Sequence, residues 1–362
     1  MQFSAANYSV GEAGGSITVT VTRSGDTSGA ATVKYGTFDG TASERSDYST
    51  SVGTLRFAAG ETSKTFVVFI VDDNYVEGNE FFAVTLSSPQ GVKLGAQSTA
   101  SVTITDNDFV QSLLNPSDDA AFYVRQHYVD FLNREPDPSG LNFWINEITS
   151  CGSDANCLAV RRVNVSAAYF LSIEFQQTGY MVYLMQKASY GNIPRYREFV
   201  GNTQEIGRGV IIGAPGADAL LEANKVAFIE DWVNRPEFKA LYDGMNDSQF
   251  VNALFSNAGI NDSAAHNSLL AGLQGGTETR GSVLRKVTEN AAFQQKELNN
   301  AFVLMQYFGY LRRNPDDAPD NNLDGYNFWL NKLNQFNGNY VNADMVKAFI
   351  SSTEYRQRFG QP

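Results

Sequence analysis

Acidic side chains in the first 108 residues stand beside the ends of predicted strands. Such strand ends can meet at one rim of a folded domain, where closely packed carboxylates repel one another unless a cation neutralises them. Calcium takes about six to eight oxygen ligands, whereas magnesium keeps several waters and uses fewer protein ligands. The acidic residues that stand at these strand ends are Glu12, Asp47, Asp72, Asp73, Asp106 and Asp108, so the sequence favours a calcium site at the rim.

A role in turns is the alternative for each of these residues, because Asp and Asn favour turns and remain solvated there. The segment 72–80, Asp-Asp-Asn-Tyr-Val-Glu-Gly-Asn-Glu, packs four carboxylates into one strand connection. Turn chemistry needs about one or two such residues. The set as a whole favours a metal site, although turn chemistry explains any single member equally well.

The elements that must position these carboxylates are short strands. The segment 16–22 alternates with period two, which places Ile17, Val19 and Val21 on one face and threonines on the other. About seven strands at this spacing predict an antiparallel, immunoglobulin-like β-sandwich. The other predicted strands are 31–38, 53–57, 64–71, 80–87 and 98–105, each bounded by Gly, Asp, Asn, Ser or Pro.

Four motifs span residues 3–108 in order: 8–12, 46–48, 71–81 and 102–108. They resemble the motifs of the Calx-beta domain, a sandwich module of sodium/calcium exchangers and of bacterial surface and secreted proteins. The resemblance implies that acidic residues at these motifs hold calcium ions. It makes the following residues candidate ligands: Glu12, Asp47, Asp72, Asp73, Glu77, Asp106 and Asp108, with Glu80 as an additional candidate. Asn74 and Asn107 stand where the most acidic family members have carboxylates, so one or two ions are expected.

From residue 120 onward the apolar residues recur at helical spacing, which predicts an all-α second part. Residues 128–137 and 140–144 are echoed at 307–316 and 325–329, so this part is predicted to be a duplicated helical bundle. The expected organisation is a sandwich at 1–108, a linker at 109–117 and a helical domain at 118–362, with its two units starting near residues 120 and 299. The helical domain is similar to the bacterial domain of unknown function catalogued under the number 4214, which implies an exported surface protein and no particular activity.

Two smaller features of the second part carry their own hypotheses. The segment 320–325 starts like an EF-hand loop, so Asp320, Asn322 and Asp324 form a weak second calcium candidate, although a polar helix connection is the favoured interpretation. Cys151 and Cys157 are the only cysteines, and in an exported protein they are expected to form a small disulfide.

The negative charge and the hydropathy of the sequence disfavour some classes of partner. Lys plus Arg (27) against Asp plus Glu (39) gives a net charge of -12, which disfavours nucleic acid and anionic membranes as partners. No apolar run is long enough for a membrane span. The first residues lack the features of a secretion signal, so we expect any such signal to be absent from this sequence.

The sequence favours a protein that is not an enzyme. His127 lies beside an apolar helix face and His266 in a polar run, and no nucleophile elbow, phosphate loop or zinc-protease helix occurs. Trp144 and Trp329 could stack sugars, but their matching helical positions favour core packing. We expect an extracellular calcium-binding module for adhesion, matrix assembly or protein interaction; a glycan-binding module is the alternative and a hydrolase the third candidate.

Overall fold

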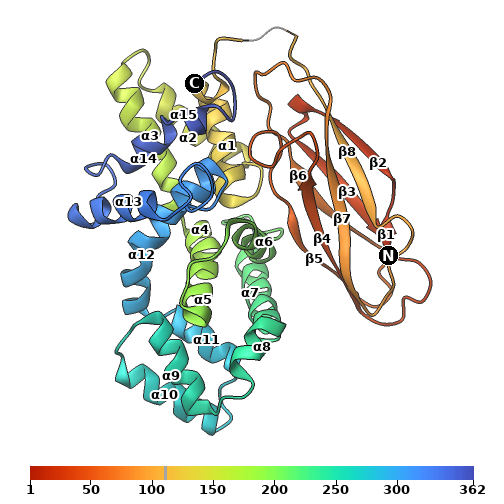
Figure 1. Cartoon of the computed structure of the whole chain (residues 1–362), viewed down its shortest axis with the longest axis vertical. Helices are drawn as coiled ribbons and strands as arrows, with labels where there is room; N and C mark the ends of the chain where they lie inside the picture. The colour runs from red at the N-terminus through yellow and green to blue at the C-terminus, as the bar shows by residue number, and fades with distance from the viewer. Residues whose placement is uncertain (110–111) are drawn as a thin grey trace. The chain divides into compact units, whose positions relative to one another are not determined.

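The computed structural model describes residues 1–109 and 112–362, so two residues of the predicted linker lie outside the described chain. The chain divides into two compact units: the first is Met1–Phe170 together with Met305–Pro362, and the second is Leu171–Leu304. Every described strand lies before residue 106, and the elements from Pro116 onward are helices (Figure 1). The predicted combination of an N-terminal sandwich and an all-α remainder is confirmed.

The sandwich consists of two sheets, one with the order β1-β3-β6 and one with the order β2-β8-β7-β4-β5. Strand β2 pairs with β8 in parallel, so the prediction of an antiparallel arrangement is wrong at this edge. Strands β1 and β2 lie outside the predicted ranges because β1 has only two residues and β2 buries no side chain fully. The strands are β1 Gln2–Phe3, β2 Asn7–Gly11, β3 Ser16–Thr22, β4 Ala31–Asp39, β5 Val52–Phe57, β6 Ser63–Phe69, β7 Glu80–Gln90 and β8 Thr99–Thr105.

The core of the sandwich follows from the period of two. Val19 and Val21 of β3 are fully buried, as predicted, and the inward residues of β7 and β8 oppose them. Two aromatic pairs fill the space between the sheets: Tyr35 stacks on Phe66 and Tyr48 on Phe82, each with ring centroids 4.1 Å apart. This packing gives the loops at the strand ends a rigid base.

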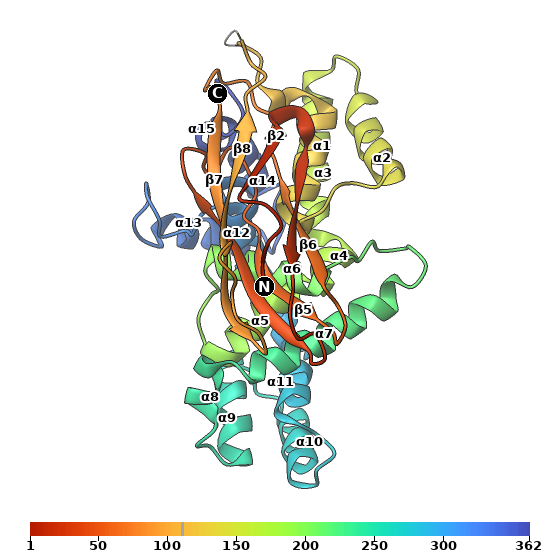
Figure 2. The ribbon, with the colours of Figure 1, turned by 90° about the vertical axis from the view of Figure 1, so that its right-hand side faces the viewer.

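The remainder of the described chain is helical, and none of its helices is long and apolar enough to cross a membrane. Figures 1 and 2 show these helices in colours from yellow to blue. Their bounds are η2 Pro116–Asp118, α1 Ala120–Leu132, α2 Pro138–Thr149, α3 Ala155–Leu171, α4 Ile173–Gln177, α5 Gly179–Tyr190, α6 Tyr196–Gly207, α7 Ala217–Val233, α8 Pro236–Tyr242, α9 Asp247–Ala258, α10 Ser263–Gln274, α11 Arg280–Thr288, α12 Ala291–Met305, η3 Gln306–Leu311 (a π-helix), α13 Asp324–Gln335, α14 Met345–Ile350 and α15 Thr353–Arg356; a short η1, Glu12–Gly14, lies in the sandwich.

The two copies of the repeated motif meet inside the first unit. Helix α1 carries the first copy and η3 the second, and Phe131 packs edge-to-face on Tyr310 with centroids 5.2 Å apart. A Cβ atom on Gly309 would lie 2.4 Å from the Phe131 ring, so the close approach requires glycine there. The helix of each copy is followed by a left-handed residue, Asn133 after α1 and Arg312 after η3. The seam is therefore shared by both copies.

In the second unit, α5 is the central helix. It contacts α4, α6, α9 and α11, and most of its residues are buried. The fully buried Trp232 of α7 donates its indole N–H to Ser189 Oγ of α5 at 3.0 Å, which satisfies its only polar atom. The arrangement around α5 is that of a helical bundle (Figure 1).

Cys151 and Cys157 form a disulfide at the connection of α2 and α3, with Cα atoms 5.5 Å apart. It closes a very short loop, so replacing both residues by serine is expected to cost at most about 3 kcal/mol of unfolding free energy. Alkylation of the denatured protein should add mass only after treatment with a reductant. Equal masses with and without reductant would contradict the disulfide.

Candidate metal centre

Strand register explains why acidic residues far apart in sequence reach one rim. Gly11, the last residue of β2, pairs with Thr105, the last residue of β8, so Glu12 and the carboxylates after β8 begin at the same edge. The antiparallel partner of β8 starts there too, because Glu80 of β7 pairs with Ile104. The other sheet has its corresponding edge where Ser16 of β3 pairs with Phe69 of β6.

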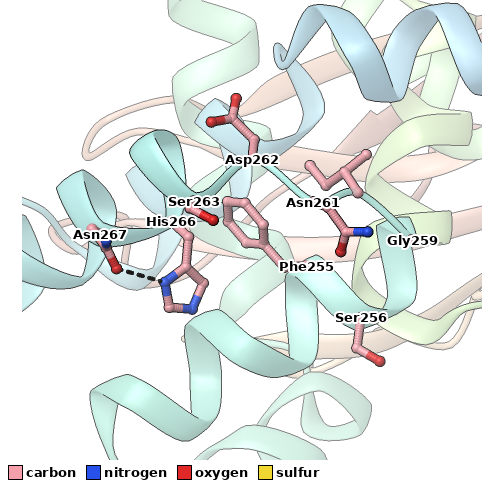
Figure 3. Close-up of a pocket in the computed structure, with 9 residues that line it drawn as sticks. Phe255, Ser256, Gly259, Asn261, Asp262, Ser263, His266 and Asn267 are labelled. Atoms are coloured by element: carbon pink, nitrogen blue, oxygen red, sulfur yellow. Dashed lines mark hydrogen bonds between the residues drawn. The ribbon is translucent and has the colours of Figure 1, made fainter.

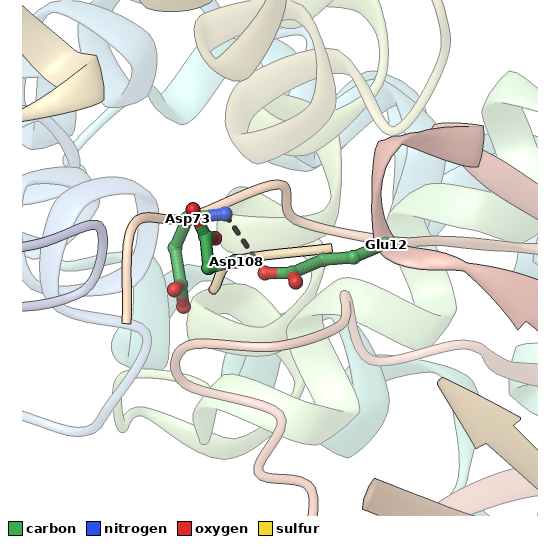
Figure 4. A group of neighbouring side chains, drawn as sticks. All are labelled: Glu12, Asp73 and Asp108. Carbon is green, nitrogen blue, oxygen red and sulfur yellow. Dashed lines mark hydrogen bonds between the residues drawn. The ribbon is translucent and has the colours of Figure 1, made fainter. Parts of the chain in front are cut away.

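Five of the predicted ligands form two overlapping groups. Within each group, one carboxylate oxygen from every residue lies within 4.8 Å of the others. The first group, shown in Figure 4, joins Glu12, Asp73 and Asp108. The second joins Asp47, Asp73 and Glu77. Asp73 belongs to both, which makes it the centre of the candidate site.

Backbone N–H groups orient the central carboxylates. The Asp73 N–H donates to Glu12 Oε1 at 2.9 Å, as the dashed line in Figure 4 shows, and the Tyr75 N–H donates to Asp73 Oδ1 at 2.7 Å. The Ser43 N–H donates to Asp47 Oδ2 at 2.6 Å. Each of these carboxylates is thus fixed through one oxygen and keeps lone pairs for another ligand.

Two carboxylate oxygens of the site are buried without an N–H or hydroxyl donor among the described residues: Asp47 Oδ1 and Asp108 Oδ2. The group that faces Asp47 is the Glu80 carboxyl, which can donate a hydrogen bond only when it is protonated. Asp47 is only 8% exposed. A buried, unpartnered carboxylate oxygen is costly unless a proton or a cation satisfies it. A divalent cation coordinated by oxygens fits this donor set.

The pKa values of the rim carboxylates also favour a cation at this site. Burial, followed by repulsion from Asp72, Asp106 and Asp108, raises the pKa of Glu12 to about 7 despite the Asp73 N–H. Burial, followed by repulsion from Glu12, Glu77 and Asp47, raises the pKa of Asp73 to about 8. The pKa values of Glu77, Glu80 and Asp108 are also raised, in each case first by burial and then by neighbouring carboxylates. A cation would remove this repulsion.

Asp106 and Asp72 occupy other positions in the rim. Asp106 accepts the N–H groups of Glu77, Gly78 and Asp108 at 2.7–2.9 Å. Burial alone would raise its pKa, but these donors outweigh burial and hold the pKa below its usual range. Asp72 accepts a hydrogen bond from the Asn107 side chain at 3.2 Å. The two residues are near the site, with Asp106 shaping the loop that carries Glu77.

The loop that starts like an EF-hand has a different set of contacts. Asp320 forms an ion pair with the buried Arg313 at 2.7 Å, so a cation already faces its carboxylate. Asn322 accepts the Asp324 N–H at 2.8 Å, next to the start of α13. The Asp320 carboxylate also lies near Gly325, as that of Asp137 lies near Gly140 in the first copy. These contacts favour the interpretation as a helix connection.

The two histidines have structural surroundings. His127 is 1% exposed, and its Nδ1 lies 2.7 Å from the Tyr123 carbonyl oxygen, which can only accept, so Nδ1 carries the proton. Its Nε2 accepts from Ser166 Oγ at 2.8 Å. Burial lowers the pKa of His127 to about 4, which keeps the ring neutral. Ser166 and His127 are both buried, and the rings of Tyr123, Phe131 and Tyr169 enclose the imidazole.

His266 lines a hollow of 670 Å³ at the turn between α9 and α10 (Figure 3). Its Nε2 lies 2.7 Å from Asn252 Oδ1, and its Nδ1 lies 3.3 Å from Asn267 Oδ1. Asp262, which also lines the hollow, accepts the Ala265 N–H and the Asn290 amide. The contact between His266 and Asn252 connects α10 with α9, and the hydrogen bond from Asn290 holds Asp262 at the start of α10.

Trp144 and Trp329 are both half-buried, so neither is fully packed in the core as their matching positions predicted. Each lies edge-on to the phenylalanine that precedes it, Phe143 or Phe328. Those two phenylalanines are 55% and 57% exposed, so the outward-facing ring of each copy is the phenylalanine. Stacking on a flat aromatic platform built from the tryptophans is not supported by this geometry.

The sandwich is similar to domains of known proteins. Residues 1–108 match the family model of the Calx-beta domain. The chain is 39% identical over 109 residues to the sodium/calcium exchanger Calx of Drosophila melanogaster, and 38% identical over 113 residues to the extracellular matrix organizing protein FRAS1 of Mus musculus. Each alignment covers 30% of this chain, but only 12% and 3% of those relatives, so the chain spans a small part of their length.

Solved structures match over the same region. The crystal structure of the apo-form Calx CBD1 domain is 39% identical and covers 30% of this chain and 96% of its own, with a TM-score of 0.29. The calcium binding domain CBD12 of CALX1.1 is likewise 39% identical, covers 30% of this chain and 45% of its own, and has the same TM-score. The similarity of residues 118–362 to the domain of unknown function is not confirmed by a family match, so it stays a prediction. Residues 1–108 of the chain are a Calx-beta domain.

Proposed function

We propose that this chain is a non-catalytic calcium-binding module whose sandwich holds one or two ions at the acidic rim. The observation that carries the proposal is the pair of carboxylate groups that share Asp73, with a buried oxygen on Asp47 that lacks an N–H or hydroxyl donor among the described residues. The Calx-beta match supports it, because a solved relative is described as a calcium binding domain. Calcium would neutralise the rim and so stabilise the fold.

The same proposal places the protein outside the cell, with adhesion, matrix assembly or another protein interaction as its role. The Cys151–Cys157 disulfide supports export, because disulfides persist in oxidising compartments. The net charge of -12 favours partners other than nucleic acids and anionic membranes. A non-catalytic role is supported by the enclosed position of the one Ser–His pair described above.

Calorimetric titration of the full chain with calcium tests the proposal, with Asp73→Asn and Asp72→Asn as matched variants. Asp73 belongs to both carboxylate groups and Asp72 to neither, although they are neighbours in sequence. Because affinity depends on the number of charged ligands, Asp73→Asn should weaken binding by roughly tenfold or more, and Asp72→Asn by much less. Unchanged affinity in Asp73→Asn, or equal losses in both variants, would count against the assigned centre.

A further inference from the structure

The connection between β4 and β5, which presents Asp47, is held by an arginine from the helical segments of the same unit. The Arg312 guanidinium donates from Nη1 to the carbonyl oxygens of Glu44 and Tyr48, at 3.1 and 2.9 Å. From Nη2 it donates to Ser49 Oγ at 2.7 Å. These acceptors flank Asp47 on both sides in the sequence, so the position of Arg312 is tied to that of a candidate ligand.

A buried charge network holds Arg312 in place. Asp130 of α1 pairs with Arg312 at 2.7 Å and with Arg358 at 3.1 Å, and all three side chains are at most 5% exposed. Arg358 also donates from Nε to the Arg45 carbonyl oxygen at 2.9 Å. Arg312 has a left-handed backbone, with φ of 49°, which is uncommon for a residue with a side chain. Such a network indicates a specific contact with the sandwich.

The connection between β6 and β7 is bonded to the C-terminal residues. The Asn74 N–H donates to the Phe359 carbonyl oxygen at 3.0 Å, and the Tyr75 hydroxyl donates to the Gly360 carbonyl oxygen at 2.7 Å. The N–H of the same Tyr75 donates to Asp73 Oδ1. Tyr75 therefore touches the central carboxylate of the site with its backbone and the end of the chain with its side chain.

The loop that follows Glu12 has a similar contact. Arg125 of α1 donates from Nη2 to the Gly15 carbonyl oxygen at 2.8 Å and pairs with Glu135. Thus three loops that present carboxylates of the rim are each bonded to helical segments of the first unit.

We propose that calcium binding at the rim and docking of α1, η3 and the segment 353–360 on the sandwich are coupled, so that calcium controls whether these helical segments are docked. The inference rests on the proposed function. Without the ion, repulsion among the carboxylates loosens the loops whose carbonyl groups accept the arginine hydrogen bonds. With the ion, these loops are ordered before docking, and linkage requires that docking strengthen calcium binding by the same factor.

Variants of the full chain that break docking contacts without removing a carboxylate test the coupling. Arg312→Met removes the guanidinium hydrogen bonds to the loop that carries Asp47. Tyr75→Phe removes one hydrogen bond to Gly360. Arg356→Met is the matched control, because Arg356 pairs with Asp118 of the helical segments. Calorimetry with calcium should show affinity reduced roughly fivefold or more in Arg312→Met, reduced less in Tyr75→Phe, and unchanged in Arg356→Met. If Arg312→Met does not fold, Tyr75→Phe decides the comparison.

Hydrogen exchange of the wild-type chain supplies a second readout. Calcium should slow amide exchange in segments 305–313 and 353–360 and leave α9 and α10 unchanged. Wild-type calcium affinity in both docking variants, together with unchanged exchange in those segments, would overturn the coupling and leave the calcium site standing. Absence of calcium binding by the wild-type chain would instead overturn the proposed function itself.

Discussion

Saturating calcium is expected to raise the melting temperature of the protein by about 5–10 °C at pH 8, the value for an ion at about 100 times its dissociation constant. The stabilisation comes from the carboxylate groups around Asp73, which calcium binds in the folded state and which are separated in the unfolded chain. Differential scanning calorimetry in calcium and in chelator measures it. Magnesium at the same concentration is the control and should give a smaller shift.

Without calcium, stability should fall as the pH rises. The folded-state pKa values of Glu12 and Asp73 are raised to about 7 and about 8, from ordinary values of 4.5 and 3.8, so the folded protein holds more protons than the unfolded chain. Their contribution is present at low pH and is lost as the pH rises through the folded-state values. Between pH 6.5 and 8 the loss should be about 2 kcal/mol for the two groups together.

This pH range distinguishes the effect of the rim carboxylates on stability from that of His127. The lowered pKa of His127 destabilises the fold only as the pH falls below its ordinary value of 6.5. Because calcium displaces the protons of the rim, the stabilisation by calcium should grow over the same window. A melting temperature in chelator that is constant or rises from pH 6.5 to 8 would show that the rim carboxylates are ionised and independent.

The second large effect is expected for Asp130→Asn. Asp130 pairs with both Arg312 and Arg358, so removing its charge takes a shared counter-ion from two buried guanidinium groups. Removal of one partner from a buried ion pair costs about 3–5 kcal/mol. Burial alone would raise the pKa of Asp130, but the two arginines outweigh it and keep that pKa low, so the loss should be seen throughout the neutral range.

Urea unfolding measures this loss, and Asp118→Asn is its control. Asp118 pairs with Arg356 at 2.7 Å, but its side chain is 61% exposed, and exposed pairs contribute about 0–1 kcal/mol. Equal midpoints for the two variants would mean that the buried network contributes no more than a surface pair.

Local patterns in the sequence predicted the parts of the fold that local physics determines. Alternation of valine and threonine identified β3, and helical spacing identified α1, because both signals require only neighbouring residues. Strand β2 was missed, since its half-buried positions at an edge give a weak pattern. Its parallel pairing with β8 depends on a strand about 90 residues away, which no local signal reveals.

Local sequence patterns also predicted only a part of the candidate site. Strand ends predicted the acidic residues of the rim, and the structure brings Glu12, Asp73 and Asp108 together. The shared position of Asp73 and the loop-shaping contacts of Asp106 depend on tertiary distances and backbone N–H groups. The docking role of Arg312 was also missed; its one trace in the sequence is the arginine at a motif position where the first copy has asparagine.

A crystal structure of the full chain grown with calcium, and with terbium as an anomalous substitute, tests the central claim most directly. The account predicts an ion at the rim within about 2.3–2.6 Å of an Asp73 oxygen, with further ligands from Asp47 and Glu77 or from Glu12 and Asp108. An empty rim at saturating calcium, or an ion bound only in the loop 320–324, would contradict it.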